Sequence, residues 1–149
     1  MVSLRPYPPA ELDAMWTESR ARYEGDLREN GGLDADEARA KAEHDAAWLR
    51  GLDTVVLEIE HDGGRVGRVV LWLDAFERPG EAWLFEIVVD EEVRGRGLGR
   101  EALRLVEQEA RSQGMRRIAL NVFAGNEVAR SLYRGVGYAE TSVHMAKPL

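Results

Sequence analysis

The sequence predicts an α+β fold in which helices cover both faces of one sheet, in the order β-αα-ββ-β-α-β-α-β. Three observations support it. Apolar residues recur at near-helical spacing in the first third of the chain, and apolar and acidic residues alternate with period two from Val55 to Glu60. Segments with helical spacing and segments with a period of two then follow one another to the end of the chain. Because 149 residues suit one core, we expect residues 1–149 to form a single domain.

A short strand and two helices are predicted first. The strand covers residues 2–5. The first helix extends to the turn at 30–32 and is predicted from four apolar residues, Leu12, Trp16, Tyr23 and Leu27. The second helix covers residues 34–50. Its first residue is an aspartate that Glu37 follows three positions later, the pattern of a capping box.

Three strands follow. Residues 55–60 and 66–73 are joined by a hairpin turn at 62–64. After a second turn, residues 83–89 form an apolar run that only Glu86 interrupts. Such a run is typical of a central strand that is covered on both faces.

The last elements are two helices and two strands. A glycine-rich turn at 94–99 leads into a helix, and its buried side is predicted to be Leu98, Ala102, Leu105, Val106 and Ala110. Apolar alternation over residues 118–122 predicts a strand. Asn126 is then placed to cap a last helix, and residues 138–147 are expected to form a final strand.

Composition limits the function. There are 20 Lys and Arg residues against 27 Asp and Glu, a net charge of −7, which argues against a general binder of nucleic-acid backbones. The absence of cysteine excludes disulfides, thiolate metal sites and thiol nucleophiles. The start of the chain lacks a signal-peptide core, and the longest apolar run, Val69–Leu73, is far below the roughly 20 residues of a membrane span. We expect a cytoplasmic protein that binds neither nucleic acid nor membrane.

The glycine-rich turn is a candidate anion site. Its glycines, which let a ligand approach the backbone closely, are Gly95, Gly97 and Gly99. Free N–H groups and the helix dipole favour an anion at such a place, and Arg94, Arg96 and Arg100 add charge. Neither the Walker pattern nor the dinucleotide pattern G-x-G-x-x-G fits. The alternative is a tight turn with solvated arginines.

Two segments resemble the GNAT acetyltransferases. Residues 85–100, with R-x-x-G-x-G beginning at Arg94, resemble the family's pyrophosphate-binding motif. Residues 126–138 resemble its second signature, N-x-x-A-x-x-L-Y-x-x-x-G-[FY]. The strong match covers residues 83–138, and the N-terminal half agrees only in the order of elements. The resemblance implies a mixed, mainly antiparallel sheet in an α/β/α sandwich, and transfer of acetyl from acetyl-CoA to a primary amine.

The resemblance also implies which residues bind acetyl-CoA. The amides of Arg94–Arg100 would hold the pyrophosphate, and backbone groups of Ile87 and Val89 would pair with the pantetheine arm. One amide would polarise the thioester carbonyl, as an oxyanion hole does. The full set is Ile87, Val88, Val89, Arg94, Gly95, Arg96, Gly97, Leu98, Gly99, Arg100, Asn126, Ala129 and Tyr133. No metal is expected, since the three histidines lack metal-ligand spacing.

Two side chains are candidates for catalysis. By the resemblance, Tyr133 protonates the departing thiolate; the alternative is a tyrosine that packs in the core. Glu86 would remove a proton from the amine, whereas the alternative is an acid that pairs with a neighbouring arginine or faces solvent. Glu81 and Asp90 are weaker candidates for the base. For Asn126 the alternative is a helix cap without a ligand.

Direct transfer in a ternary complex is expected, because there is no cysteine and neither Ser131 nor Ser142 has an evident activating base. The acceptor is expected to be a small-molecule or peptide amine. The resemblance also suggests a homodimer through edge strands or the C-terminal strand. The alternatives are a non-catalytic acyl-CoA-binding sensor or scaffold, and a helix–sheet interaction domain that does not use its glycine turn.

Overall fold

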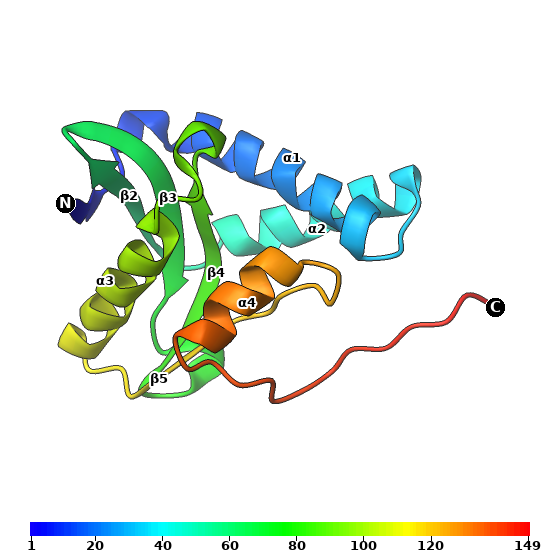
Figure 1. Cartoon of the computed structure of the whole chain (residues 1–149). Helices are drawn as coiled ribbons and strands as arrows, with labels where there is room; N and C mark the ends of the chain where they lie inside the picture. Colours follow the sequence, from blue (N-terminus) through cyan, green and yellow to red (C-terminus); the bar gives the residue numbers. More distant parts are fainter.

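The computed structural model describes residues 1–149 and contains one five-stranded sheet (Figure 1). The strands lie in the order in which they occur along the chain. Their bounds are β1 Val2–Pro6, β2 Val55–His61, β3 Gly64–Trp72, β4 Glu81–Val89 and β5 Arg117–Ala119. Strands β1 to β4 pair antiparallel, and β5 pairs parallel with β4. The mixed, mainly antiparallel sheet is therefore confirmed, with β3 rather than β4 at its centre.

Helices cover both faces of this sheet (Figure 1). Their bounds are α1 Leu12–Asn30, α2 Ala35–Arg50, α3 Leu98–Ser112 and α4 Glu127–Gly135. Helices α1 and α2 pack against each other on one face, while α3 and α4 lie on the other. No helix is both long enough and apolar enough to cross a membrane.

The helix ends follow local signals in the sequence. The Asp34 side chain accepts a hydrogen bond from Glu37 N at 2.9 Å, and the Glu37 side chain accepts one from Asp34 N at 3.0 Å. This reciprocal pair is the predicted capping box. At the start of α4, Asn126 Oδ1 accepts a hydrogen bond from Ala129 N at 3.2 Å. Both predicted caps are confirmed.

The main core lies between the sheet and α3. Side chains of β3 and β4, such as Val69 and Leu84, pack against α3. The buried residues of α3 are Leu98, Ala102, Leu103, Val106 and Ala110, close to the predicted stripe. Helix α1 differs more, since its buried residues are Met15, Ser19 and Leu27. The buried Ser19 shows that this helix presents a polar group to the sheet.

The end of the chain differs from the prediction. Strand β5 stops at Ala119, and residues 120–122 extend without a strand partner. Residues 138–147, expected as a final strand, pair with no strand of the chain, and every side chain from Ala139 onward is exposed. The tail leaves the body of the molecule (Figure 1). Alternating side chains allow a strand, but its backbone groups need a neighbouring edge, and no edge of this chain lies beside the tail. The predicted sixth strand is therefore wrong for the single chain.

We predict that Gly67→Ala lowers the free energy of unfolding by about 2 kcal/mol. A Cβ at Gly67 would overlap the carbonyl oxygen of Val88 and lie 3.1 Å from Ile59 Cδ1, so β3 and β4 would have to move apart. Gly64→Ala in the same strand is the control, because its nearest neighbour is an oxygen 4.0 Å away. Denaturant unfolding measures both variants, and equal losses would contradict the close approach.

Candidate functional site

Strand β5 pairs with β4 over its whole length, but only with the first three residues of β4. Glu81–Trp83 lie opposite Arg117–Ala119, and beyond them β4 has no strand on this side. Its other edge stays paired with β3 as far as Val89. A shift in the pairing of β3 and β4 leaves Phe85 without a partner, which marks a β-bulge. The bulge lies just past the point where β4 and β5 diverge. Strand β4 therefore has one free edge along most of its second half.

The backbone groups of Ile87 and Val89 point toward this free edge. Asp90 N donates to a carbonyl of β3 at 2.8 Å, and the Val88 carbonyl faces β3 as well. In antiparallel pairing, successive residues direct their N–H and C=O groups to opposite sides, so Ile87 and Val89, which alternate with Val88 and Asp90, point the other way. The Val89 carbonyl accepts a hydrogen bond from Arg94 Nε at 2.8 Å. An extended ligand could pair with the remaining backbone groups of Ile87 and Val89. Val88 offers it no backbone group, because its carbonyl faces β3.

The glycine-rich turn is open and its amides are free. Gly95 and Gly97 have φ angles of +76° and +80°, and a Cβ on either would meet no atom within 4 Å. The first hydrogen bond of α3 joins Glu101 N to Gly97 O at 3.1 Å. The amides of residues 95–100 consequently have no acceptor within the protein. Six adjacent free donors at a helix N-terminus are an arrangement that favours the binding of an anion.

Two arginines at the ends of the turn make contacts within the protein. The amide of Arg94 donates to Glu91 O at 3.3 Å, so the row of free amides begins one residue later than expected. Arg100 Nη1 donates to Gly135 O at 3.3 Å and links the start of α3 to the end of α4. The exposed residues of the turn are Arg94, Gly95, Arg96, Gly97 and Arg100.

Tyr133 lies half-buried on α4, with its ring centroid 5.6 Å from that of Tyr138. Burial raises the pKa of its hydroxyl, while the charge of Arg22 on α1 acts in the opposite direction. The hydroxyl is therefore protonated at neutral pH, as a proton donor must be. The oxygen of Asn126, by contrast, is used by the helix cap, which is the alternative that the sequence left open.

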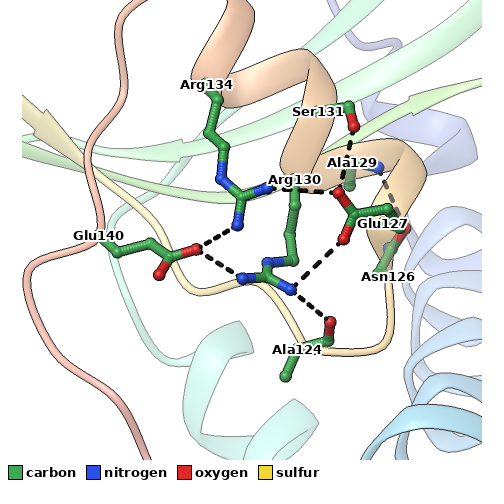
Figure 2. A network of polar contacts seen from close by, with 8 residues as sticks. All are labelled: Ala124, Asn126, Glu127, Ala129, Arg130, Ser131, Arg134 and Glu140. Atoms are coloured by element: carbon green, nitrogen blue, oxygen red, sulfur yellow. Dashed lines mark hydrogen bonds and ion pairs between the residues drawn. The ribbon is translucent and has the colours of Figure 1, made fainter.

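A polar network fixes α4 and the start of the tail, as Figure 2 shows. Glu140 Oε1 lies 2.7 Å from the Nη2 atoms of both Arg130 and Arg134. Arg130 also donates to Ala124 O at 2.9 Å, and Glu127 pairs with both arginines. These groups are largely exposed, so they add little stability, but they direct the tail away from the sheet.

Glu86 faces α1 and has polar partners on both oxygens. Its Oε1 lies 2.8 Å from Arg68 Nε and 2.7 Å from Arg68 Nη2, and its Oε2 accepts a hydrogen bond from the Ser19 hydroxyl. Arg68 is only 6% exposed and also pairs with Glu18 at 3.2 Å. The arginine partner that the sequence analysis left open as an alternative is thus present. The sequence signal for this ion pair was Arg68 itself, which lies inside the mostly apolar strand β3.

The sequence analysis missed two residues on α1. Arg22 and Asp26 follow Ser19 at helical spacing and share its side of the helix. Asp26 is half-buried, and burial raises the pKa of its carboxyl. The charges of Glu29 and Glu86 add to this increase, and that of Arg22 opposes it. Arg22 is exposed and Asp26 half-buried, and their spacing of three and seven residues from Ser19 was the available signal.

These features agree with a known family. Residues 4–138 match the model of the acetyltransferase (GNAT) family. The chain belongs to the GNAT acetyltransferase family. The fold expected from the resemblance is confirmed, apart from the last strand.

Relatives and solved structures agree with this assignment. The crystal structure of YycN from Bacillus subtilis superimposes with a TM-score of 0.90 at 29% identity, over 100% of this chain and 99% of that one. In sequence, YycN, an uncharacterised N-acetyltransferase, is 43% identical over 81 residues, 53% of this chain and 52% of YycN. The uncharacterised N-acetyltransferase YdgE of the same bacterium is 40% identical over 87 residues, 58% of this chain and 55% of YdgE.

A more distant relative matches along nearly the whole chain. The mycothiol acetyltransferase of Kytococcus sedentarius is 28% identical over 145 residues, 95% of this chain and 47% of that protein. The chain spans about half the length of the curated relatives it matches. The activity, the acyl donor and the acceptor are therefore inferred from the site.

We predict that Arg68→Met lowers the free energy of unfolding by about 3 kcal/mol, because Glu86 loses its buried counter-charge. The double variant Arg68→Met/Glu86→Leu should lose less than the sum of the single losses, since no charge is then left unpaired. Arg111→Met, which removes an exposed partner of Glu107, is the control and should be nearly neutral. Strict additivity in urea unfolding at pH 7 would contradict the pairing.

Proposed function

We propose that this chain is a single-domain N-acetyltransferase that transfers acetyl from acetyl-CoA to a primary amine by direct attack in a ternary complex. One observation carries the proposal: six free amides at residues 95–100 continue from the free edge of β4. Membership of the GNAT family supports acyl transfer as the reaction class.

The chemistry of coenzyme A fits this row of donors. Its diphosphate suits the amides and the dipole of α3, and the exposed arginines of the turn add positive charge. The pantetheine arm carries amide groups of its own, which can pair with Ile87 and Val89 as an added strand does. In this proposal Gly99 belongs to the row that holds the diphosphate, and Asn126 and Ala129 lie beside the arm.

The transfer needs three things from the protein. A backbone N–H at the free edge of β4 would polarise the thioester carbonyl. Tyr133 would give a proton to the departing thiolate, which suits a hydroxyl that burial keeps protonated. Glu86 is the proposed catalytic carboxylate: with Arg68 and Ser19 fixing its position, its charge would draw the ammonium group of the acceptor to the thioester.

A cationic amine is the proposed acceptor, either a small molecule or a peptide. Helix α1 contributes Glu18, Asp26 and Glu29 near the side from which Glu86 is reached. A hollow of about 530 Å³ lies at the connection of α1 and α2, and its lining residues are Gly25, Arg28, Glu29, Leu33, Asp34 and Ala35. These acidic side chains of α1 favour positively charged ligands.

A homodimer is also part of the proposal. Residues 138–147 form no regular secondary structure and pair with no strand of their own chain. Strand β5 is an edge strand of three residues, and an unpaired segment of a second copy could extend that edge. A cytoplasmic location stays a prediction from the sequence.

We predict that Gly97→Val weakens the binding of acetyl-CoA at least about tenfold, because the new side chain would occupy the space that the diphosphate needs. Gly114→Val is the matched control: Gly114 follows the other end of α3, has a φ of +86°, and also meets nothing within 4 Å. Both variants carry the same kind of backbone strain. Calorimetry measures the affinities, and equal binding by the two variants would refute the anion site.

We predict that Tyr133→Phe lowers kcat by about 100-fold or more and leaves the affinity for acetyl-CoA unchanged, since only the proton donor is lost. Because burial raises the pKa of Tyr133, its deprotonation should not limit the wild-type rate below about pH 10. Tyr138→Phe, which alters the neighbouring ring, is the control.

The turnover of both tyrosine variants is measured by the release of the coenzyme A thiol from acetyl-CoA. Full activity of Tyr133→Phe would remove Tyr133 from the mechanism. Wild-type protein that binds acetyl-CoA but releases no thiol with any amine would instead favour the non-catalytic sensor or scaffold.

A further inference from the structure

One side of α1 contacts both flanks of the place where β4 and β5 diverge. Near its middle, the Ser19 hydroxyl donates to Glu86 on β4. At its end, Asn30 Oδ1 lies 2.7 Å from the position that a Cβ on Gly125 would take, in the loop that leads to α4. Residues of α1 between these two contacts, on the same side, must therefore face the region between β4 and α4.

Arg22 and Asp26 occupy that stretch. They follow Ser19 by three and by seven residues, which are about one and two helical turns. The charge of Arg22 acts on Tyr133 of α4, and that of Glu86 on β4 acts on Asp26. Asp26 is therefore near the catalytic carboxylate of β4, on the side from which the proposed acceptor would enter.

The two carboxylates of this region have different surroundings. Both oxygens of Glu86 are engaged, one by Arg68 and one by a hydroxyl of α1. Asp26 accepts no side-chain hydrogen bond, although it is half-buried. Burial raises its pKa, the charges of Glu29 and Glu86 raise it further, and Arg22 acts against them. A carboxylate with unoccupied oxygens and increased basicity is suited to proton uptake.

Building on the proposed function, we propose that Asp26 takes the proton from the acceptor amine, while Glu86 supplies the fixed charge that holds the ammonium group. Asp26 accepts one proton from R–NH₃⁺. The amine nitrogen then bonds to the thioester carbon, the C–S bond breaks and its electron pair goes to sulfur. The nitrogen loses its second proton to water, and the thiolate takes the proton of the Tyr133 hydroxyl, which water then restores. Asp26 returns its proton to water.

This assignment predicts a specific pH dependence. The groups that face Asp26 are Arg22 and Glu29 from α1 and Glu86, with its partner Arg68, from the sheet. On α4, Tyr133 lies beyond Arg22. The base works only when it is deprotonated, so kcat/KM should rise with pH through the raised pKa of Asp26. Removal of the Glu29 charge should lower that pKa and move the rise to lower pH.

The test measures thiol release from acetyl-CoA against pH, with a panel of primary amines that contains an amino acid, a polyamine, an aminoglycoside and a peptide. We expect Asp26→Asn to lower kcat/KM by about 100-fold or more and to abolish the acid limb, with acetyl-CoA affinity unchanged in calorimetry. Glu29→Gln should shift the midpoint of that limb downward, which a purely structural Asp26 would not explain. Asp13→Asn is the control, because Asp13 pairs with Arg50 at 2.6 Å on the exposed side of α1.

The outcomes separate the two proposals. If Asp26→Asn keeps the wild-type pH profile, or if Glu29→Gln leaves the midpoint unmoved, Asp26 is not the base and the proposed function stands. If the wild type releases no thiol with any amine of the panel, the proposed function fails and this inference fails with it.

Discussion

Strand β4 loses its partner on one side after Trp83, and the whole candidate site depends on that loss. Strand β5 is short and β4 has a bulge at Phe85, so β4 and β5 diverge. As a result, Ile87 and Val89 turn backbone groups toward an edge that no strand covers. The free amides of residues 95–100 continue this row to the N-terminus of α3. The chain thus leaves a line of hydrogen-bond donors unused in folding, where a ligand that is extended at one end and anionic at the other can use them.

The two layers of helices divide the work around this edge. Helices α3 and α4 carry the candidate anion site and Tyr133, whereas α1 brings polar side chains to the opposite face of β4. The buried Arg68 connects the sheet to α1, because it pairs with Glu86 of β4 and with Glu18 of α1. A buried charge pair is seldom a gain in stability over apolar packing, so its value here lies in fixing a carboxylate and a helix relative to one strand edge.

Local signals were enough to predict much of the fold. The capping box at Asp34, the cap at Asn126 and the apolar side of α3 each depend on residues within a few positions, and all three are present. The strand expected at 138–147 failed because pairing depends on a neighbouring edge, which the local sequence alone cannot supply. For the site, the open glycine turn was predicted from its residue types. The partner of Glu86 is 18 residues away on another strand, and Asp26 reaches the site only through the packing of α1.

The central claim is that main-chain nitrogens of the turn and of the β4 edge hold coenzyme A. The most direct measurement is a series of two-dimensional amide ¹H–¹⁵N spectra recorded as acetyl-CoA is added to the labelled protein. The account predicts that the largest shifts occur at residues 95–100 and at Ile87 and Val89, with little change in β1 and β2. Shifts confined to other segments, or unchanged turn amides at saturating acetyl-CoA, would contradict it.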